Sequence, residues 1–182
     1  MYSQIQASRL CPAAPDAAPP SSWVNKPGNA YPGFGTADYP WNWDTFGPAG
    51  QNDHGGYAIN SWCYSNLGAT GSYYNKESGI TSPSLTPYFS DSTWVDGGIN
   101  ETDTPARNLY TGADNNGMER ITIARHGGSG ASSAPKNVPA GSQLVGRIDV
   151  GFSDGHVEMV KLEKLWTLYW HGGWVTPAVR PP

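Results

Sequence analysis

Apolar and polar residues alternate most regularly between residues 147 and 162. Asp154 and Gly155 divide this stretch into two runs. An Asp-Gly pair in that position predicts a β-hairpin, because glycine readily adopts the positive φ of the turn. With these two residues as the loop, one face of the hairpin is mostly apolar and the other mostly polar, as in a sheet that buries one face. The predicted register pairs Phe152 with Val157, Val150 with Met159 and Ile148 with Lys161.

Three further segments have the composition and alternation of short strands: residues 56–64, 88–95 and 118–125. After the hairpin, apolar residues recur at positions i, i+3, i+4 and i+7, which is the spacing of one helix face. A Gly-Gly pair and a Pro-rich tail then end the pattern. We therefore expect a short C-terminal helix whose buried side is formed by Leu162, Leu165, Trp166 and Tyr169.

The fold class expected from these elements is α+β and mainly β. It combines an antiparallel sheet, long loops rich in glycine and proline, and the short C-terminal helix. Residues 1–182 suit a single domain. Residues 127–146 consist largely of small residues, and we interpret them as a flexible insertion.

Composition and charge exclude some classes of protein and partner. The chain has 23 Gly and 16 Pro, but its 8 Trp and 10 Tyr supply the apolar bodies that a disordered chain lacks. A net charge of −4 without a basic run argues against nucleic acid as a partner. No apolar stretch approaches the roughly 18 residues needed to cross a bilayer, and no signal peptide is visible, so we expect a soluble chain.

The C-terminal third resembles a known family. The segments RHGG at 125–128, DVGFSDGHVEMVKLEKLW at 149–166 and WHGGW at 170–174 are similar to the prepilin-type-processing-associated H-x9-D-G domain. This domain occurs in pseudopilins related to type II secretion in planctomycete and verrucomicrobial lineages. The segments at 9–15, 55–62 and 82–94 also resemble those proteins, so the similarity covers most of the chain in patches.

The sequence departs from that family in two ways. The family has nine residues between its His and its Asp-Gly, whereas 27 residues separate His126 from Asp154 here. The insertion at 127–146 accounts for the excess. In addition, pilin-like proteins begin with a cleaved leader and a long apolar helix, neither of which we find. We therefore expect the chain to correspond to the soluble C-terminal head alone.

The resemblance implies a function in assembly and not in catalysis. The chain is expected to be a non-enzymatic structural subunit, the extracytoplasmic head of a pseudopilin-like protein. Its partners would be other pilin-like subunits or secretion-system proteins, and only the absent N-terminal helix would contact the membrane. The parent protein would lie in the periplasm, in the cell envelope or outside the cell.

Four residues form the signature: His126, Asp154, Gly155 and His156. We expect them to form a structural latch in which His126 reaches the turn at Asp154. The competing hypothesis is a hydrolase that uses the two histidines and Asp154. However, no HExxH or HxxEH motif and no Ser-His-Asp arrangement at recognisable spacing supports it.

Cysteines and acidic loops leave further options open. Cys11 and Cys63 belong to no zinc-type motif and either form a disulfide or stay as two buried thiols. By analogy with the calcium loop of major type II pseudopilins, one hypothesis is a calcium ion held by oxygen ligands on a loop, and the competing interpretation is a solvated polar loop without an ion. The weak candidate ligands are Asp91, Asp96, Asp103 and Asp114.

The tryptophans support an alternative function. Trp-rich loops and low charge are also typical of a carbohydrate-binding module, in which exposed rings stack on sugars. The candidate platform consists of Trp41, Trp43 and Trp62. The competing interpretation is that these rings pack in the core and turns of a β-rich domain.

Overall fold

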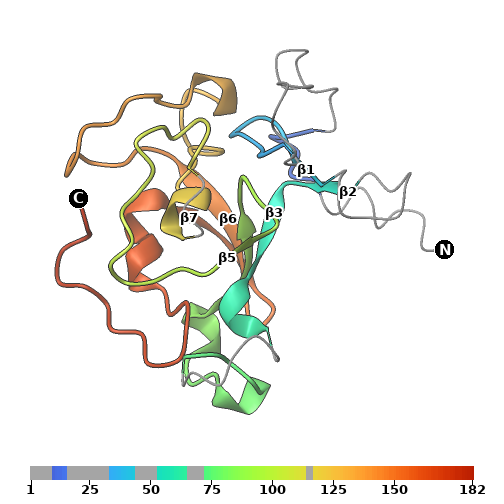
Figure 1. Ribbon diagram of the computed structural model, residues 1–182, viewed down its shortest axis with the longest axis vertical. Coiled ribbons are helices and arrows are strands. Elements are labelled where there is room, and N and C mark those ends of the chain that lie inside the picture. The colour runs from blue at the N-terminus through green and yellow to red at the C-terminus, as the bar shows by residue number, and fades with distance from the viewer. Residues whose placement is uncertain (1–9, 16–32, 44–52, 65–71, 114–116) are drawn as a thin grey trace.

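The computed structural model describes residues 10–15, 33–43, 53–64, 72–113 and 117–182 (Figure 1). A five-stranded sheet with the order β5-β3-β4-β6-β7 lies at its centre, and β1 and β2 form a separate two-stranded sheet. The neighbouring strands are antiparallel except for β3 and β5, which are parallel. The fold is therefore mainly β and mostly antiparallel, as predicted, and the parallel β5 is a departure from the prediction.

Among the residues that the structure describes, the strands are short and the helical turns are all of the 3-10 type. The strands are β1 (Trp41–Trp43), β2 (Asp53–Gly55), β3 (Tyr57–Asn60), β4 (Pro87–Asp91), β5 (Asp96–Gly97), β6 (Arg147–Phe152) and β7 (Val157–Lys161). The 3-10 turns are η1 (Ser61–Cys63), η2 (Glu77–Gly79), η3 (Pro83–Leu85), η4 (Met118–Arg120), η5 (Ala131–Ser133) and η6 (Leu162–Thr167).

The hairpin forms between β6 and β7, but its register differs from the prediction by one residue. Val150 pairs with Glu158, and Gly151 pairs with Val157. The loop contains three residues, with Gly155 at a φ of 91°. An Asp-Gly pair fits either a two-residue loop or a three-residue loop that ends in a left-handed glycine, so the sequence does not distinguish the two registers.

The shift in register moves every side chain of β7 to the opposite face. Val157 and Met159 were predicted to lie opposite Phe152 and Val150 on the buried face. They instead lie on the other face, where they are 71% and 45% exposed, and Val160 is buried in their place. The two sides of the five-stranded sheet are named here the inner face, which carries Ile148, Val150, Phe152 and Val160, and the outer face, which carries Tyr57, Ile59, Phe89, Asp149, Gly151, Val157 and Met159.

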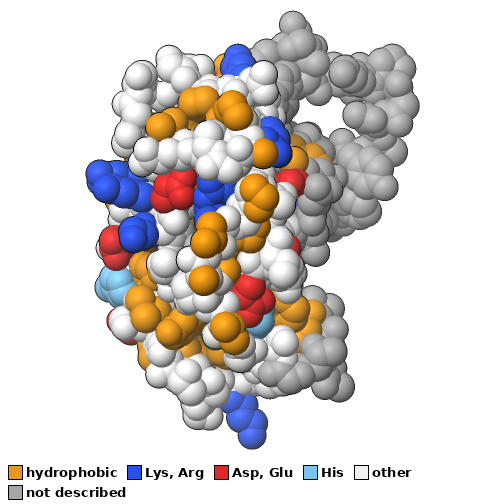
Figure 2. All heavy atoms as spheres, turned by 90° about the vertical axis from the view of Figure 1, so that its left-hand side faces the viewer, with side chains coloured by type: hydrophobic (Ala, Val, Ile, Leu, Met, Phe, Trp, Pro, Cys, Tyr) orange, Lys and Arg blue, Asp and Glu red, His pale blue; other side chains and the backbone are white. Residues whose placement is uncertain are grey.

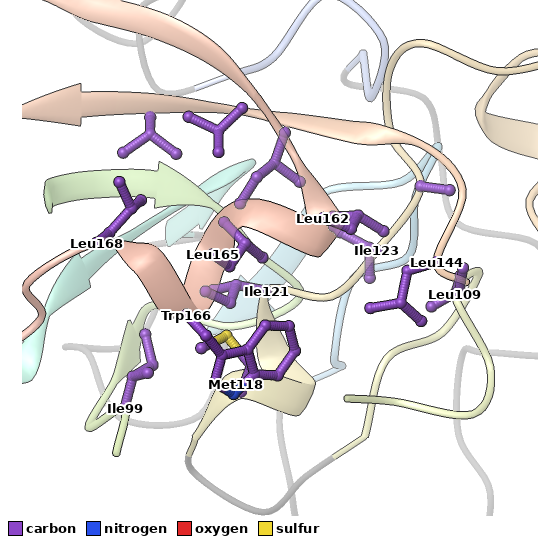
Figure 3. Close-up of a cluster of buried hydrophobic side chains, with 14 of the residues drawn as sticks. Ile99, Leu109, Met118, Ile121, Ile123, Leu144, Leu162, Leu165, Trp166 and Leu168 are labelled. Carbon is purple, nitrogen blue, oxygen red and sulfur yellow. The ribbon is translucent and has the colours of Figure 1, made fainter. Parts of the chain in front are cut away.

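The main hydrophobic core lies on the inner face. The turn η6 buries Leu162, Leu165 and Trp166 there, and the first three of its four predicted buried positions are therefore confirmed. Figure 3 shows this turn beside the strands, with Met118 and Ile121 from a separate segment among the same buried side chains. The predicted α-helix is a six-residue 3-10 helix, and Tyr169 lies beyond it, partly buried.

Two other segments differ from their predicted structures. Residues 118–125 form η4 and an extended loop instead of a strand, because the side chains at 118 and 120–125 are all buried and need no alternation. Residues 127–146 are packed and not a free loop. Four apolar side chains of this segment join the core, namely Ala131, Ala134, Val138 and Leu144.

The surface on the side of η6 and the C-terminal tail is mixed. Figure 2 shows apolar, acidic and basic described side chains interspersed on this face. No helix in the described part of the chain has the length and apolar character needed to cross a bilayer.

Candidate metal centre

One end of the outer face carries polar residues. Tyr57 of β3 pairs with Asp91 of β4, and the backbone amide of Asp149 in β6 donates to Asp91 Oδ2 at 2.7 Å. These side chains therefore form one row across three strands. His126 lies next to this row because its backbone forms an isolated β-bridge with Arg147, two residues before Asp149.

Four potential ligand atoms converge at this point. His126 Nε2 lies 3.2 Å from Cys11 Sγ, 3.1 Å from Asp91 Oδ2 and 3.4 Å from Asp149 Oδ2. The four ligand atoms all lie within 4.8 Å of one another, and in the described part of the chain this is the group that could hold a metal ion. We name Cys11, Asp91, His126 and Asp149 the His126 cluster.

The chain approaches itself closely where Cys11 enters. A Cβ atom built on Gly56 would lie 2.9 Å from the Cys11 backbone nitrogen and 3.1 Å from Arg125 Nη1. Only glycine leaves room there for both neighbours. Residues 10–15 can therefore lie against the start of β3, and the Cys11 side chain, which is 0% exposed, reaches the row.

Arg125 supports the cluster on its buried side. Its fully buried guanidinium forms an ion pair with Asp91, with 2.8 Å between Nη1 and Oδ1. It also donates to four backbone carbonyls, those of Thr36, Ala37, Gly56 and Ser92. Because Arg125 holds Oδ1, the other oxygen of Asp91 is directed toward His126 and the amide of Asp149.

The electrostatics of the cluster favour a positive charge at its centre. The hydrogen bond with Asp91, followed by that with Cys11, raises the pKa of His126 to about 10. Although burial opposes ionisation of Asp91, hydrogen bonds from His126 and Arg125 hold the pKa of its carboxyl below the usual value. Burial and the neighbouring charge of Asp91 raise the pKa of Asp149. Burial, with Cys11 and Asp91 nearby, raises the pKa of the Tyr57 hydroxyl.

The arrangement differs from that of a Cys-His-Asp catalytic triad. In a triad the nucleophile and the orienting carboxylate contact opposite nitrogens of the imidazole. Here Cys11 and both carboxylates contact the same atom, Nε2 of His126. The sulfur is also fully buried, so a substrate could not reach it. Several ligand atoms that face one point are instead typical of a metal centre.

The structure separates the signature residues that were predicted to meet. His126 lies at the Arg147 end of β6, whereas Asp154 lies in the loop beyond the other end of that strand. Asp154 Oδ1 contacts His156 Nδ1 at 2.5 Å, and Gly155 supplies the left-handed turn. The His156 ring stacks on Phe152 at 4.3 Å. The expected contact between His126 and the turn at Asp154 is therefore not formed, because the strand holds them apart.

The cysteines and the calcium candidates also lie apart. Cys11 and Cys63 are both free thiols, and burial raises the pKa of Cys63 to about 11. Asp96 forms an ion pair with Arg120, and Asp103 accepts from backbone amides. Asp91 belongs to the His126 cluster, and Asp114 lies outside the described residues. The three described candidates thus share no common loop site.

Two tryptophans of the predicted sugar-binding platform are packed within the fold. The Trp41 indole donates to the Tyr57 carbonyl, and its ring covers Gly55 so closely that a Cβ there would lie 2.6 Å from it. Trp62 donates to the Ile99 carbonyl and contacts His171. No tryptophan side chain that the structure describes is among the exposed large apolar residues. The side chain of Trp43 lies outside the described residues.

Sequence patterns gave partial signals for the cluster. Asp149 interrupts the apolar alternation of β6, which marks it as a residue of a polar face. The sequence predicts other roles for Cys11 and Asp91 and none for Arg125 and Tyr57. The Arg-His pair at 125 and 126, which follows the mostly apolar residues 121–124, is the pattern that could have indicated this site.

Comparison of the chain with protein-family models, with curated proteins and with solved structures found no match.

Proposed function

We propose that the chain is the head of a pseudopilin-like subunit, a non-enzymatic component of an assembly in the cell envelope. The observation that carries this proposal is the uncovered apolar part of the outer face. A row of residues crosses four strands there, in the order Ile59, Phe89, Gly151 and Val157.

This row is open at Phe89 of β4 and at Val157 of the edge strand β7. Phe89 is 48% exposed, Val157 is 71% exposed, and Met159 in the adjacent row is 45% exposed. Gly151 adds no side chain between Phe89 and Val157, so the surface between them is low. Contiguous apolar residues on a sheet face usually mark a place where another element packs.

A helix placed on this face would complete a two-layer domain. In pilin-like proteins a long N-terminal helix packs on the sheet of the head and also assembles the filament. Burying apolar surface gains roughly 25 cal/mol per Å², so covering Phe89, Val157 and Met159 would stabilise such an assembly substantially. The inner face is already covered by η6, which leaves the outer face for this helix.

The backbone hydrogen bonds of His126 are a second support for the proposed function. The amide of His126 donates to the Arg147 carbonyl at 2.9 Å, and the amide of Arg147 donates back at 2.8 Å. Residues 127–146 thus begin and end next to each other, at the paired residues His126 and Arg147, as expected of an insertion. Without them, His126 would be followed almost directly by the strand that leads to Asp154.

The proposal is tested by charging the outer face in the parent organism. Val157→Asp and Met159→Asp are made in the chromosomal gene, with Val179→Asp as the matched control, since Val179 is 82% exposed in the C-terminal tail. The outer-face variants should abolish incorporation into envelope-associated assemblies, measured by fractionation and by cross-linking to subunits that carry a prepilin-type leader. The control should assemble normally.

Thermal unfolding of the purified variant domains shows whether a substitution impairs assembly without impairing folding. All three positions are exposed, so each variant should unfold within a few degrees of the parent chain. If the outer-face variants are folded and still assemble like the control, the proposal is wrong.

A further inference from the structure

We propose that the His126 cluster is a structural zinc site that fastens the segment at residues 10–15 to the outer face of the sheet. The four ligands are Cys11, Asp91, His126 and Asp149. This inference stands on the cluster alone and goes beyond the proposed function.

The donor set selects the class of ion. A thiol and an imidazole beside two carboxylates suit zinc or another late first-row divalent ion, whereas calcium takes oxygen ligands only. The set also has the ligand number of a structural zinc site, which is normally closed by four protein side chains. The Cys11 thiol and the His126 imidazole beside Asp91 therefore favour zinc over the calcium that the sequence suggests at Asp91.

The spacing of the donors fits such an ion. A tetrahedral zinc with bonds of about 2.0–2.3 Å separates neighbouring ligand atoms by roughly 3.3–3.6 Å. The contacts of His126 Nε2 with the sulfur and with the two carboxylate oxygens are 3.2, 3.1 and 3.4 Å. All four ligand atoms lie within 4.8 Å of one another, so binding would draw the more distant pairs together around the ion.

The charges also balance. The two carboxylates and a Cys11 thiolate carry three negative charges, and the Arg125 guanidinium paired with Asp91 compensates one of them. The remaining two match a divalent cation. Asp91 is in addition fixed by Arg125 and by the amide of Asp149, and such supporting hydrogen bonds orient metal ligands in known sites.

An ion could enter from one side. The side chains of His126 and Asp149 are 17% and 32% exposed, whereas those of Asp91 and Arg125 are fully buried. The site therefore has an open edge at His126 and Asp149 and a closed base. Cys11 is the ligand from residues 10–15, so metal binding would join that segment to β4 and β6.

Cobalt(II) titration of the purified chain without a histidine tag tests the inference, because tetrahedral cobalt bound to a thiolate gives intense visible bands and a sulfur-to-cobalt charge-transfer band. The chain is first treated with a chelator. It should then bind one cobalt per molecule with both signals, and zinc should displace the cobalt. Cys11→Ser should abolish the charge-transfer band. Cys63→Ser is the matched control, because Cys63 is the other free thiol, and should titrate like the parent chain.

A second variant separates loss of the ligand from loss of the fold. Asp149→Asn changes a partly exposed ligand and should weaken zinc binding by at least about tenfold while the circular dichroism spectrum is retained. Zinc should also raise the unfolding midpoint of the parent chain in a chelator-reversible way, because only the folded state assembles the site. The inference is overturned if the parent chain binds no stoichiometric metal, or if the charge-transfer band persists in Cys11→Ser. Assembly in the cell plays no part in these readouts, so their failure would leave the proposed function standing.

Discussion

The two faces of β6 alternate residue by residue and have opposite properties. On the inner face, Ile148, Val150 and Phe152 are at most 4% exposed and pack with η6. On the outer face, Asp149 joins a charged cluster and Gly151 lies between two exposed apolar residues. One strand therefore contributes both to the hydrophobic core and to the outer face with the His126 cluster.

The inner face follows from the local sequence pattern, whereas the outer face depends on contacts between residues that are far apart in the sequence. The inner face is a continuous apolar layer whose members need only be buried. The outer face depends on specific partners, since Asp91 is fully buried and tolerable there only with Arg125 and His126 beside it. The following predictions test whether the two faces respond differently to substitution, in order of decreasing effect.

Removing the buried cation should have the largest effect. Arg125→Met should destabilise the chain by about 3–5 kcal/mol, because Asp91 would stay buried without its partner. Urea unfolding measures the change, and Arg107→Met is the control, since Arg107 is exposed and should change stability by less than about 0.5 kcal/mol. Equal effects of the two substitutions would mean that the outer-face ion pair is not structurally important.

The two faces of β7 can be compared directly with one type of substitution. Val160→Ala should cost about 1.5–3 kcal/mol, since Val160 is 5% exposed, whereas Val157→Ala should be nearly neutral in the isolated chain. Thermal or urea unfolding gives both values. The predicted two-residue loop would have buried Val157 instead, so a larger loss for Val157→Ala would support that register over the observed one.

The C-terminal tail should respond to acid. Glu101 accepts hydrogen bonds from the Val175 amide and from His171. Burial opposes its ionisation, but these hydrogen bonds hold the pKa of its carboxyl below 4.5. Its contribution is therefore complete above that pH and is lost as the pH falls through the folded-state pKa. The partly exposed contact contributes about 1 kcal/mol or less.

Hydrogen exchange at the amide of Val175 measures this effect. Exchange, corrected for its intrinsic pH dependence, should accelerate as the pH falls below 4.5 in the parent chain. Glu101→Gln should show the faster opening already at neutral pH and little further change in acid. Unchanged protection in that variant would remove Glu101 from the account of the tail.

The sequence predicts the local part of this structure well. The hairpin, its Asp-Gly turn and the buried positions at Leu162, Leu165 and Trp166 follow from spacing within a few residues. The register does not, because a left-handed Gly155 can end either a two-residue loop or the observed three-residue loop, which also includes Ser153. A change of one residue there reverses the orientation of all of β7.

The His126 cluster could not be predicted because its members are distant in sequence. Cys11 and His126 are 115 positions apart, and Asp91 and Asp149 are 58 apart. They meet through the pairing of β4 with β6 and through the bridge between His126 and Arg147. The sequence placed His126 with Asp154 instead because the two share a signature, although β6 separates them.

X-ray absorption spectroscopy of the zinc-loaded chain tests the central claim, that the outer face ends in a metal centre. The four proposed ligands predict a first shell of one sulfur at about 2.3 Å and three nitrogen or oxygen atoms at roughly 2.0–2.1 Å. The sulfur contribution should disappear in Cys11→Ser and remain in Cys63→Ser. A shell of oxygen and nitrogen alone in the parent chain, or six-coordinate zinc, would contradict the account.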